Sequence, residues 1–328
     1  MIQLSKIDIS QLSEHRTQIM GLAALMIIVC HAPASGVIMP NILARIMGLG
    51  NFGVDIFLFL SGLGCYYSLN KNRGGYFCYL KRRFSRLMIP YLLISFPFCL
   101  FYLLLGRDNL LDTIYCLTTL EYWLFHKGAW FVALMIPLYL FSPALYKICD
   151  GTTKSWVYVA ILVFITTYLS SVSSLHTVVS NIQSALLRTP SFLIGMAIAP
   201  YCMNKKTISV KWGIIPVSCY FIFTALHIRQ YAIWAIMPVV MYISIFLVKL
   251  LSKIHILNEF VTLMGNISLE SYLTNINLNS LLVFLIPSYI DSPIFYGRYV
   301  EYATVIVLGI LMAYVYKRIT QRIFKFAS

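Results

Sequence analysis

Charged residues are scarce in this sequence, and acidic residues are the scarcest of all. Only 11% of the 328 residues are Asp, Glu, Lys or Arg, whereas 60% are hydrophobic. A soluble domain cannot solvate such a surface, so the composition excludes the soluble globular class. We therefore expect an all-α polytopic membrane protein, because an open strand cannot satisfy its backbone groups in lipid.

Paired cysteine motifs and internal repeats are also missing. None of the eight cysteines belongs to a CxxC pair, and most lie within apolar runs, which is typical of buried small hydrophobes rather than of disulfides or metal ligands. We expect neither a metal nor a permanently bound cofactor. The chain also shows no repeat of the kind that transporters carry. The cysteines are Cys30, Cys65, Cys78, Cys99, Cys116, Cys149, Cys202 and Cys219.

Long apolar runs are abundant instead. Ten of them approach the roughly twenty residues that a bilayer demands. They lie near 17–35, 51–69, 85–105, 129–148, 155–171, 180–202, 212–228, 231–251, 267–287 and 300–316. The apolar stretch 110–125 carries Asp112 and Glu121, so we expect an interfacial or re-entrant helix there. Since no soluble segment of useful size is left over, residues 1–328 are expected to form a single membrane domain.

The cationic residues predict how the chain is oriented. Cytoplasmic loops of membrane proteins are enriched in Lys and Arg. If the N-terminus is cytoplasmic, all but six of the 25 lysines and arginines fall in inside segments, and the C-terminus is cytoplasmic as well. This asymmetry accounts for the net charge of +14 without a nucleic-acid partner. The six outer residues are Arg45, Arg107, Lys127, Arg188, Arg229 and Arg298.

His31 is the first candidate for chemistry. It lies near the end of the apolar run 20–34, MGLAALMIIVCHAPA. An ionisable group at membrane depth is costly, and its default interpretation is functional. The alternative is a histidine that sits among lipid headgroups or bonds to a neighbouring helix.

The second span carries a carboxylate, Asp55, within GNFGVDIFLFLSGLG. A carboxylate in such a run is expensive unless it is paired. Because both residues lie toward the outer side, we expect Asp55 to bond one nitrogen of His31, which would fix the tautomer and raise the basicity of the other nitrogen. The alternative is that Asp55 caps the start of the span. Gly62 and Gly64 are expected to permit close helix packing.

Two arginines before the third span form a candidate anion site. Positive-inside bias accounts for Lys81 in the segment YLKRRFSRLMIPY. Arg83 and Arg86 are three residues apart and would share one helix face, so that both guanidiniums can grip one polyanion. The phosphates of a nucleotide-bearing molecule fit that chemistry.

Six segments in order resemble the acyltransferase-3 family of bacterial membrane acyltransferases. They are the helix ending in His31, GVDIFLFLSG, KRRFSRLMIPY, GAWFVALMIPLYLFSPAL (128–145), LLRTPSFLIGM (186–196) and MGNISLESYLTN (264–275). The chain departs from the family pattern at Met20, where members usually have arginine, and at Asn275, where they often have histidine. Arg16, one helical turn before Met20, either replaces that arginine or is a plain topology charge. We expect no soluble esterase-like domain, which many members carry.

The resemblance implies a reaction and the residues that perform it. An acyl group, most often acetyl, would move from cytoplasmic acyl-coenzyme A to a sugar hydroxyl of an exported or lipid-linked glycan. His31, with Asp55, would act as a general base or carry the acyl group itself. The expected donor-binding residues are Arg83, Arg86 and Arg16, and the expected acceptor-side residues are Glu121, Trp130, Arg188 and Asn275. The protein would lie in the bacterial inner (plasma) membrane.

Two of these residues have a structural alternative. Trp130 could stack on a sugar, but a tryptophan at this position is also typical of an anchor at the membrane interface. Arg188 lies within an apolar span, where it either pairs with a buried acid or meets the acyl donor.

Two other function classes fit parts of the sequence. A transporter of a small solute or lipid-linked sugar would use Asp55, Arg188 and the asparagines 275, 277 and 279 to line a path. A scaffold for a glycan-assembly complex is the third class, if Met20 and Asn275 mark a loss of activity. Consumption of acyl-coenzyme A by purified protein separates an enzyme from both.

Overall fold

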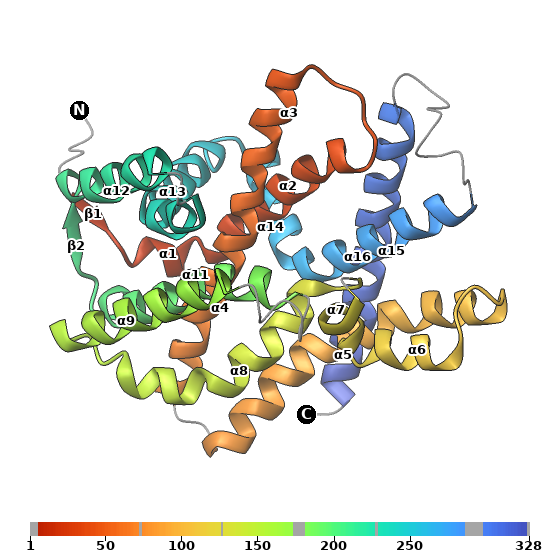
Figure 1. Cartoon of the computed structure of the whole chain (residues 1–328), viewed down its shortest axis with the longest axis horizontal. Helices are drawn as coiled ribbons and strands as arrows, with labels where there is room; N and C mark the ends of the chain where they lie inside the picture. The colour runs from red at the N-terminus through yellow and green to blue at the C-terminus, as the bar shows by residue number, and fades with distance from the viewer. Residues whose placement is uncertain are drawn as a thin grey trace. The chain divides into compact units, whose positions relative to one another are not determined.

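The computed structural model of the chain describes residues 6–71, 74–125, 127–172, 181–226, 229–285 and 298–326, and these are almost entirely helical (Figure 1). The helices are α1 (Gln11–Glu14), α2 (Arg16–Ala34), α3 (Asn41–Gly48), η1 (Leu49–Asn51), α4 (Phe52–Asn70), α5 (Gly75–Leu104), α6 (Leu110–Leu117), α7 (Leu120–Phe125), α8 (Trp130–Ile148), α9 (Thr153–Ser170), α11 (Ile182–Met203), η2 (Val210–Gly213), α12 (Ile214–Ala225), α13 (Arg229–Leu251), α14 (His255–Asn266), α15 (Ser268–Leu285) and α16 (Tyr299–Phe326). Strands β1 (Lys6–Asp8) and β2 (Thr207–Ser209) pair antiparallel.

Among the described residues, eight helical segments are long and apolar enough to cross a membrane, and all eight coincide with predicted spans. The predicted span 212–228 contains the shorter apolar helix α12. The predicted span 267–287 contains α15, which is 18 residues long but carries three asparagines. The all-α polytopic membrane fold is therefore confirmed, whereas the count of ten stays a prediction. The ends of predicted spans at 180, 227–228 and 286–287 lie outside the described residues.

The stretch 110–125 forms two short helices, where one was predicted. A capping box begins α6: the Asn109 side chain accepts from the Asp112 amide at 2.9 Å, and the Asp112 carboxylate accepts from the Asn109 amide at 3.1 Å. The two helices are separated at Thr119, whose φ of 65° lies in the left-handed region, where a right-handed helix cannot continue. At eight and six residues, α6 and α7 are too short to span a bilayer.

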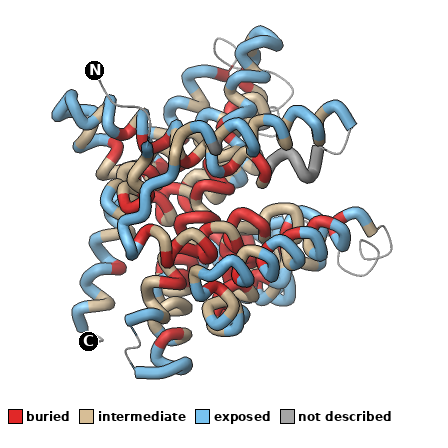
Figure 2. The backbone as a smooth tube through the Cα atoms, turned by 90° about the vertical axis from the view of Figure 1, so that its left-hand side faces the viewer, coloured by how far each residue is buried: buried red, intermediate tan, exposed pale blue. Residues whose placement is uncertain are grey.

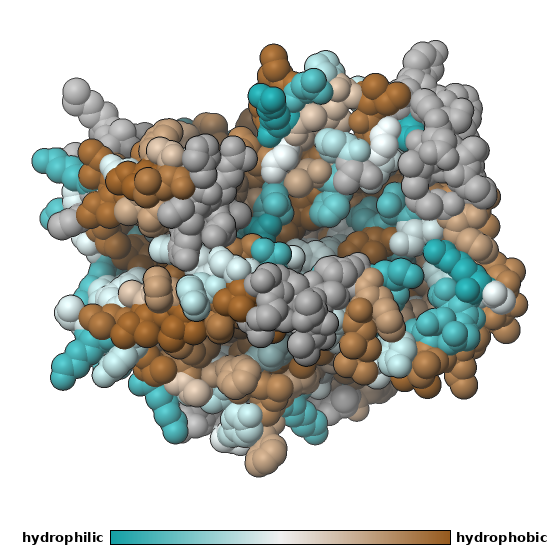
Figure 3. All heavy atoms as spheres, viewed as in Figure 1, coloured by the Kyte–Doolittle hydropathy of each residue, from teal (hydrophilic) through white to brown (hydrophobic). Residues whose placement is uncertain are grey.

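Helix α9 shows how the apolar residues divide between protein and lipid. Its positions 159, 163 and 167 are buried, whereas Val157, Ile161, Phe164 and Tyr168 are exposed along the opposite side. Brown apolar side chains cover this helix in the surface view (Figure 3). An exposed stripe of this kind is stable when lipid covers it, as expected of a membrane-spanning helix.

Two compact units make up the chain, and each draws on three separate segments. The first comprises Met1–Ala23, Phe52–Leu80 and Leu138–Gly265, and the second comprises Ala24–Asn51, Lys81–Pro137 and Asn266–Ser328. In the first unit, α4 is buried at 11 of its 19 positions, which makes it the central helix. Buried and exposed stretches alternate along most other helices (Figure 2). The expectation of a single domain stays a prediction.

Reciprocal glycine contacts bring α4 and α11 together in the first unit. A Cβ on Gly62 of α4 would lie 2.1 Å from the carbonyl oxygen of Phe192, and one on Gly195 of α11 would lie 2.0 Å from that of Phe59. Any larger residue at either position would push the backbones apart. Small residues at helix contacts are how membrane helices achieve close packing, and the prediction for Gly62 is confirmed.

Candidate functional site

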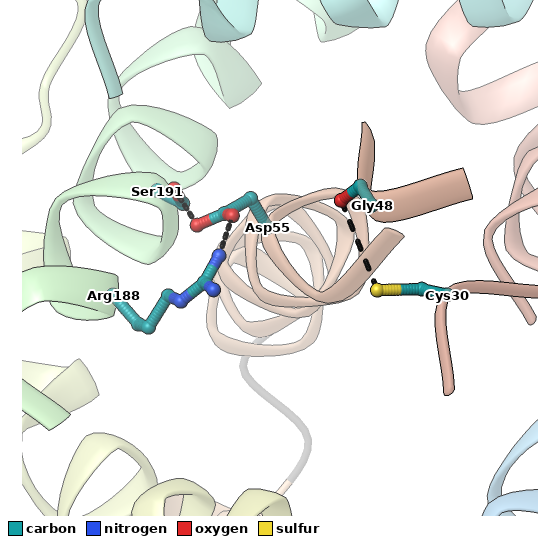
Figure 4. Close-up of polar contacts among 5 residues, drawn as sticks. All are labelled: Cys30, Gly48, Asp55, Arg188 and Ser191. Atoms are coloured by element: carbon teal, nitrogen blue, oxygen red, sulfur yellow. Dashed lines mark hydrogen bonds and ion pairs between the residues drawn. The ribbon is translucent and has the colours of Figure 1, made fainter. Parts of the chain in front are cut away.

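Asp55 is fully buried in the first turn of α4, and its carboxylate is bound by two residues of α11. Arg188 forms an ion pair with one carboxylate oxygen, and Ser191 Oγ donates to the other at 2.8 Å (Figure 4). Arg188 and Ser191 share a helix face because they are three residues apart. The structure therefore shows Arg188 as the partner of a buried acid. Ser191 is a member of this network that the sequence reasoning missed, although its spacing from Arg188 was visible.

Arg16 also belongs to the first unit, at the start of α2. Its Nη2 donates to the carbonyl oxygen of Leu60 in α4 at 3.3 Å, and its side chain is half-buried. A plain topology charge would extend into water or headgroups instead. Arg16 therefore helps to hold α2 against α4, and its assignment to donor binding stays a prediction.

His31 lies near the end of α2 in the second unit, where the helix is held from two sides. The neighbouring Cys30 thiol donates to the Gly48 carbonyl at the end of α3 at 3.8 Å (Figure 4). The Tyr302 hydroxyl of α16 donates to the carbonyl of Ile28. These contacts fix the helix end on which the exposed His31 side chain is carried.

The hydrogen bond of His31 determines which ring nitrogen is basic. Nδ1 lies 2.8 Å from the carbonyl oxygen of Ile27, one turn earlier in α2. A carbonyl oxygen only accepts, so the neutral ring must carry its proton on Nδ1, and Nε2 keeps the lone pair. The orienting acceptor is therefore supplied by the helix itself.

The predicted contact between His31 and Asp55 would join residues of different units. His31 lies in the second unit and Asp55 in the first, where it is engaged with Arg188 and Ser191. That contact stays a prediction.

Arg83 and Arg86 lie in α5, one helical turn apart, as the sequence predicted. Arg83 is half-buried and Arg86 is exposed. A second cationic surface lies at the end of α16, where a groove of about 390 Å³ is lined by Tyr314, Arg318, Gln321, Arg322 and Lys325. The Tyr314 hydroxyl accepts from Arg318 Nη2 at 2.6 Å, which orients that guanidinium. The second unit thus offers two places where a polyanion could bind.

Glu121 lies in the first turn of α7 and is half-buried. Burial raises the pKa of this carboxyl, while a hydrogen bond from the Cys116 side chain and the charge of Lys127 act in the opposite direction. Gly128, whose φ of 80° requires glycine, brings the backbone against the carboxylate: a Cβ there would lie 3.1 Å from a Glu121 oxygen. Gly128 therefore packs directly against the Glu121 carboxylate.

Trp130 and Asn275 are placed by helix contacts. Trp130 begins α8 and is half-buried, and its ring meets that of Phe131 edge-on. Asn275 Nδ2 donates to the Ser271 carbonyl of its own helix at 2.7 Å. A Cβ on Gly309 of α16 would lie 2.5 Å from Asn275 Oδ1, so the asparagine fills a notch between α15 and α16. A role for either residue in acceptor binding stays a prediction.

A second buried ion pair escaped the sequence reasoning. Glu270 of α15 is 1% exposed, and one of its oxygens accepts from Lys317 Nζ of α16 at 3.1 Å. The segment ISLESYL was singled out for its resemblance, but its glutamate was given no role. The sequence did contain a signal for this pair, because a carboxylate within an apolar run is expected to have a charged or hydrogen-bonding partner.

No metal site emerges within the described ranges, where no group of three or more His, Cys, Asp or Glu side chains could hold an ion.

A comparison with protein families gives a match that covers most of the chain. A family model described as an acyltransferase domain matches residues 19–315. The range includes His31, Asp55, the arginines of α5 and the segment around Arg188, and it begins after Arg16. Comparisons with curated proteins and with solved structures gave no match.

Proposed function

Because the chain belongs to the acyltransferase-3 family of membrane acyltransferases, we propose that it moves an acyl group, most often acetyl, from cytoplasmic acyl-coenzyme A to a sugar hydroxyl of an exported or lipid-linked glycan. The membrane would be the bacterial inner membrane, with both termini in the cytoplasm. The observation that carries the proposal is His31, an exposed imidazole near the end of a candidate span, with its tautomer fixed by the Ile27 carbonyl.

In that tautomer, Nε2 of His31 is the nitrogen that can act as a base or as a nucleophile. Nε2 takes the proton of the acceptor hydroxyl while the hydroxyl oxygen attacks the thioester carbonyl carbon. The thiolate of coenzyme A then leaves and takes up a proton. In the second form of the mechanism, Nε2 itself attacks the thioester and carries the acyl group to the acceptor. Both forms need the Nε2 lone pair to reach the substrate, and the exposure of the His31 side chain supports that access.

Arg83 and Arg86 are the donor-binding residues in this proposal. Guanidiniums on one helix face can bind the phosphates of coenzyme A with charge-assisted hydrogen bonds. Their end of α5 would face the cytoplasm, where the donor is made. The groove of Arg318 and Arg322 on α16 is the rival position for the same phosphates.

The acceptor would meet the protein on the outer side, where Glu121 and Trp130 are placed in the predicted topology. Burial raises the pKa of Glu121, and this carboxyl is placed to exchange a hydrogen bond with a sugar hydroxyl of the acceptor. Arg188 and Asn275 are already engaged in helix contacts, so binding an acceptor would require them to exchange partners.

The decisive experiment measures release of free coenzyme A by the purified protein in detergent or liposomes, with glycan acceptors present. The expected result is acceptor-dependent release, together with a mass increase of the acceptor by one acyl group. Acceptor that crosses liposome membranes unmodified, with no coenzyme A released, would overturn the proposal in favour of transport. Neither release nor transport by a folded protein would favour the scaffold.

A further inference from the structure

Two cysteines on neighbouring helices of the second unit lie side by side. The Cys99 thiol of α5 points to Cys116 Sγ of α6, with 2.9 Å between the two sulfur atoms. Both are free thiols here, and they are 17 positions apart in the chain. The sequence reasoning interpreted every cysteine as a buried small hydrophobe, and this contact gives two of them a chemical relationship.

The surrounding structure holds the two sulfurs in place. The Tyr91 hydroxyl of α5 donates to the Cys116 carbonyl, so that α6 is tied to α5 at this residue. The capping box at Asn109 fixes the start of α6. A disulfide bond is about 2.0 Å long, so closing it from this arrangement requires a movement of about 0.9 Å.

The depth of the pair follows from the length of α5. Cys99 is 13 residues beyond Arg86, about 20 Å along the helix axis, toward the end opposite the cationic segment. Helix α6, which is too short to span, follows that end in the sequence, packs back against α5 and carries Cys116. With the cationic end in the cytoplasm, the pair lies toward the oxidising, extracytoplasmic side. This placement rests on the orientation given in the proposed function.

We propose that Cys99 and Cys116 are a modification site: they form a disulfide by exchange with an oxidised protein dithiol outside the cytoplasm. Disulfides persist in that compartment and are rare in the cytosol. Cys116, the more exposed of the two residues, attacks the partner's disulfide as its thiolate, forming a mixed disulfide and releasing one partner thiolate. Cys99 then attacks the Cys116 sulfur and releases the second partner thiolate. The two protons of Cys99 and Cys116 end on the partner, which is reduced by the two electrons that the pair gives up.

Glu121 is placed to assist this exchange. The Cys116 side chain lies beside the Glu121 carboxyl, which in its ionised form takes the thiol proton as the sulfur attacks. Once formed, the bond ties α6 and the following α7, which carries Glu121, to the outer end of α5. The disulfide would thereby fix one wall of the proposed acceptor side.

Tryptic peptides give a direct test, because Arg107 lies between the two cysteines. Intact cells are treated with N-ethylmaleimide, which blocks free thiols before lysis, and the purified protein is digested without reductant. Residues 87–107 and 108–127 are tryptic peptides that each contain one cysteine. We expect most of both peptides to appear as one disulfide-linked species that separates on reduction. Recovery of both peptides mainly as maleimide adducts would overturn the proposal.

Single variants provide the controls. Cys99→Ser should remove the linked species and make Cys116 reactive toward maleimide, and Cys116→Ser should do the same for Cys99. Cys78→Ser, at the exposed opposite end of α5, should leave the linkage intact. If the linkage survives either of the first two variants, the assignment of its partners is wrong. Because the readout needs no turnover, failure of the proposed acyl transfer and failure of the disulfide are distinguishable. A cysteine at Lys127, probed with an impermeant maleimide, reports the orientation separately.

Discussion

Ser191 Oγ donates a 2.8 Å hydrogen bond to Oδ1 of Asp55, a carboxylate that solvent does not reach. The ion pair with Arg188 occupies the second oxygen. Two family-like segments far apart in the sequence, GVDIFLFLSG and LLRTPSFLIGM, meet at this point. A charge buried in this way is tolerated only while its partners remain, and the cost of removing one is correspondingly large.

Arg188→Met should destabilise the protein by about 3–5 kcal/mol, because it leaves the Asp55 charge buried without its cation. The double variant Asp55→Leu with Arg188→Met should recover much of that loss, since it removes both charges. Thermal unfolding in detergent measures both, and Lys253→Met, at an exposed position, is the matched control. A double variant that unfolds as readily as the single one would show that the ion pair does not set the stability.

Gly195→Ala tests the close approach of α4 and α11. The added methyl group would lie 2.0 Å from the Phe59 carbonyl oxygen, so the helices must separate, at a cost of about 1–3 kcal/mol. Gly48→Ala is the control, because a Cβ there meets no atom within 4 Å. Equal melting temperatures for the two variants would be inconsistent with the packing described.

The sequence predicted the helices and several site residues for identifiable reasons. Apolar runs of bilayer length place most spans, and an ionisable residue in such a run singled out His31, Asp55 and Arg188. The contacts of Ser191 and Lys317 depend on which helices become neighbours, which local sequence does not encode. The break at Thr119 depends on one backbone angle that a threonine rarely adopts. The contact between the Cys99 and Cys116 sulfurs likewise depends on the packing of α5 against α6, which local sequence does not predict.

Glu121 should give the protein a specific dependence on pH. Burial raises the pKa of this carboxyl in the folded state above its unfolded value of about 4.3. The folded protein therefore keeps the proton to higher pH than the unfolded chain does, and stability is lost as the pH rises from the unfolded pKa through the folded one. The melting temperature of the wild type relative to Glu121→Gln should fall over that window. The same comparison with Glu14→Gln, at an exposed position, should not reproduce this trend; a flat difference for Glu121→Gln would contradict the burial argument.

Arg83→Ala with Arg86→Ala should weaken acyl-coenzyme A binding at least about tenfold, because each charge-assisted contact contributes about 1.5–3 kcal/mol. Binding is measured by calorimetry on the purified protein, whose melting temperature confirms folding. Arg318→Ala with Arg322→Ala is the matched pair in the α16 groove and should leave the affinity unchanged. If the α16 pair weakened binding and the α5 pair did not, the donor phosphates would be assigned to the α16 groove instead.

His31→Gln should abolish acyl transfer while leaving expression, folding and donor binding intact. Glutamine retains hydrogen-bonding capacity but cannot take a proton, so a general base would be lost, at a cost of about 10²–10⁴-fold in turnover, and an acyl carrier would be lost altogether. The readout is coenzyme A release at saturating donor and acceptor. His255→Gln, at an exposed position on α14, is the matched control and should turn over normally.

Asp55→Asn adds a test of what orients the imidazole of His31. If the Ile27 carbonyl alone sets the tautomer, as the 2.8 Å contact to Nδ1 indicates, turnover per folded molecule should be retained in Asp55→Asn even where stability falls. If Asp55 also bonds the ring during turnover, the rate should fall with donor binding unchanged, and less than in His31→Gln, because the ring is misoriented rather than removed. Near-normal turnover in a folded His31→Gln protein would contradict both forms of the mechanism. The histidine would then be a packing or interface residue, and transport or scaffolding would become the better account of the chain.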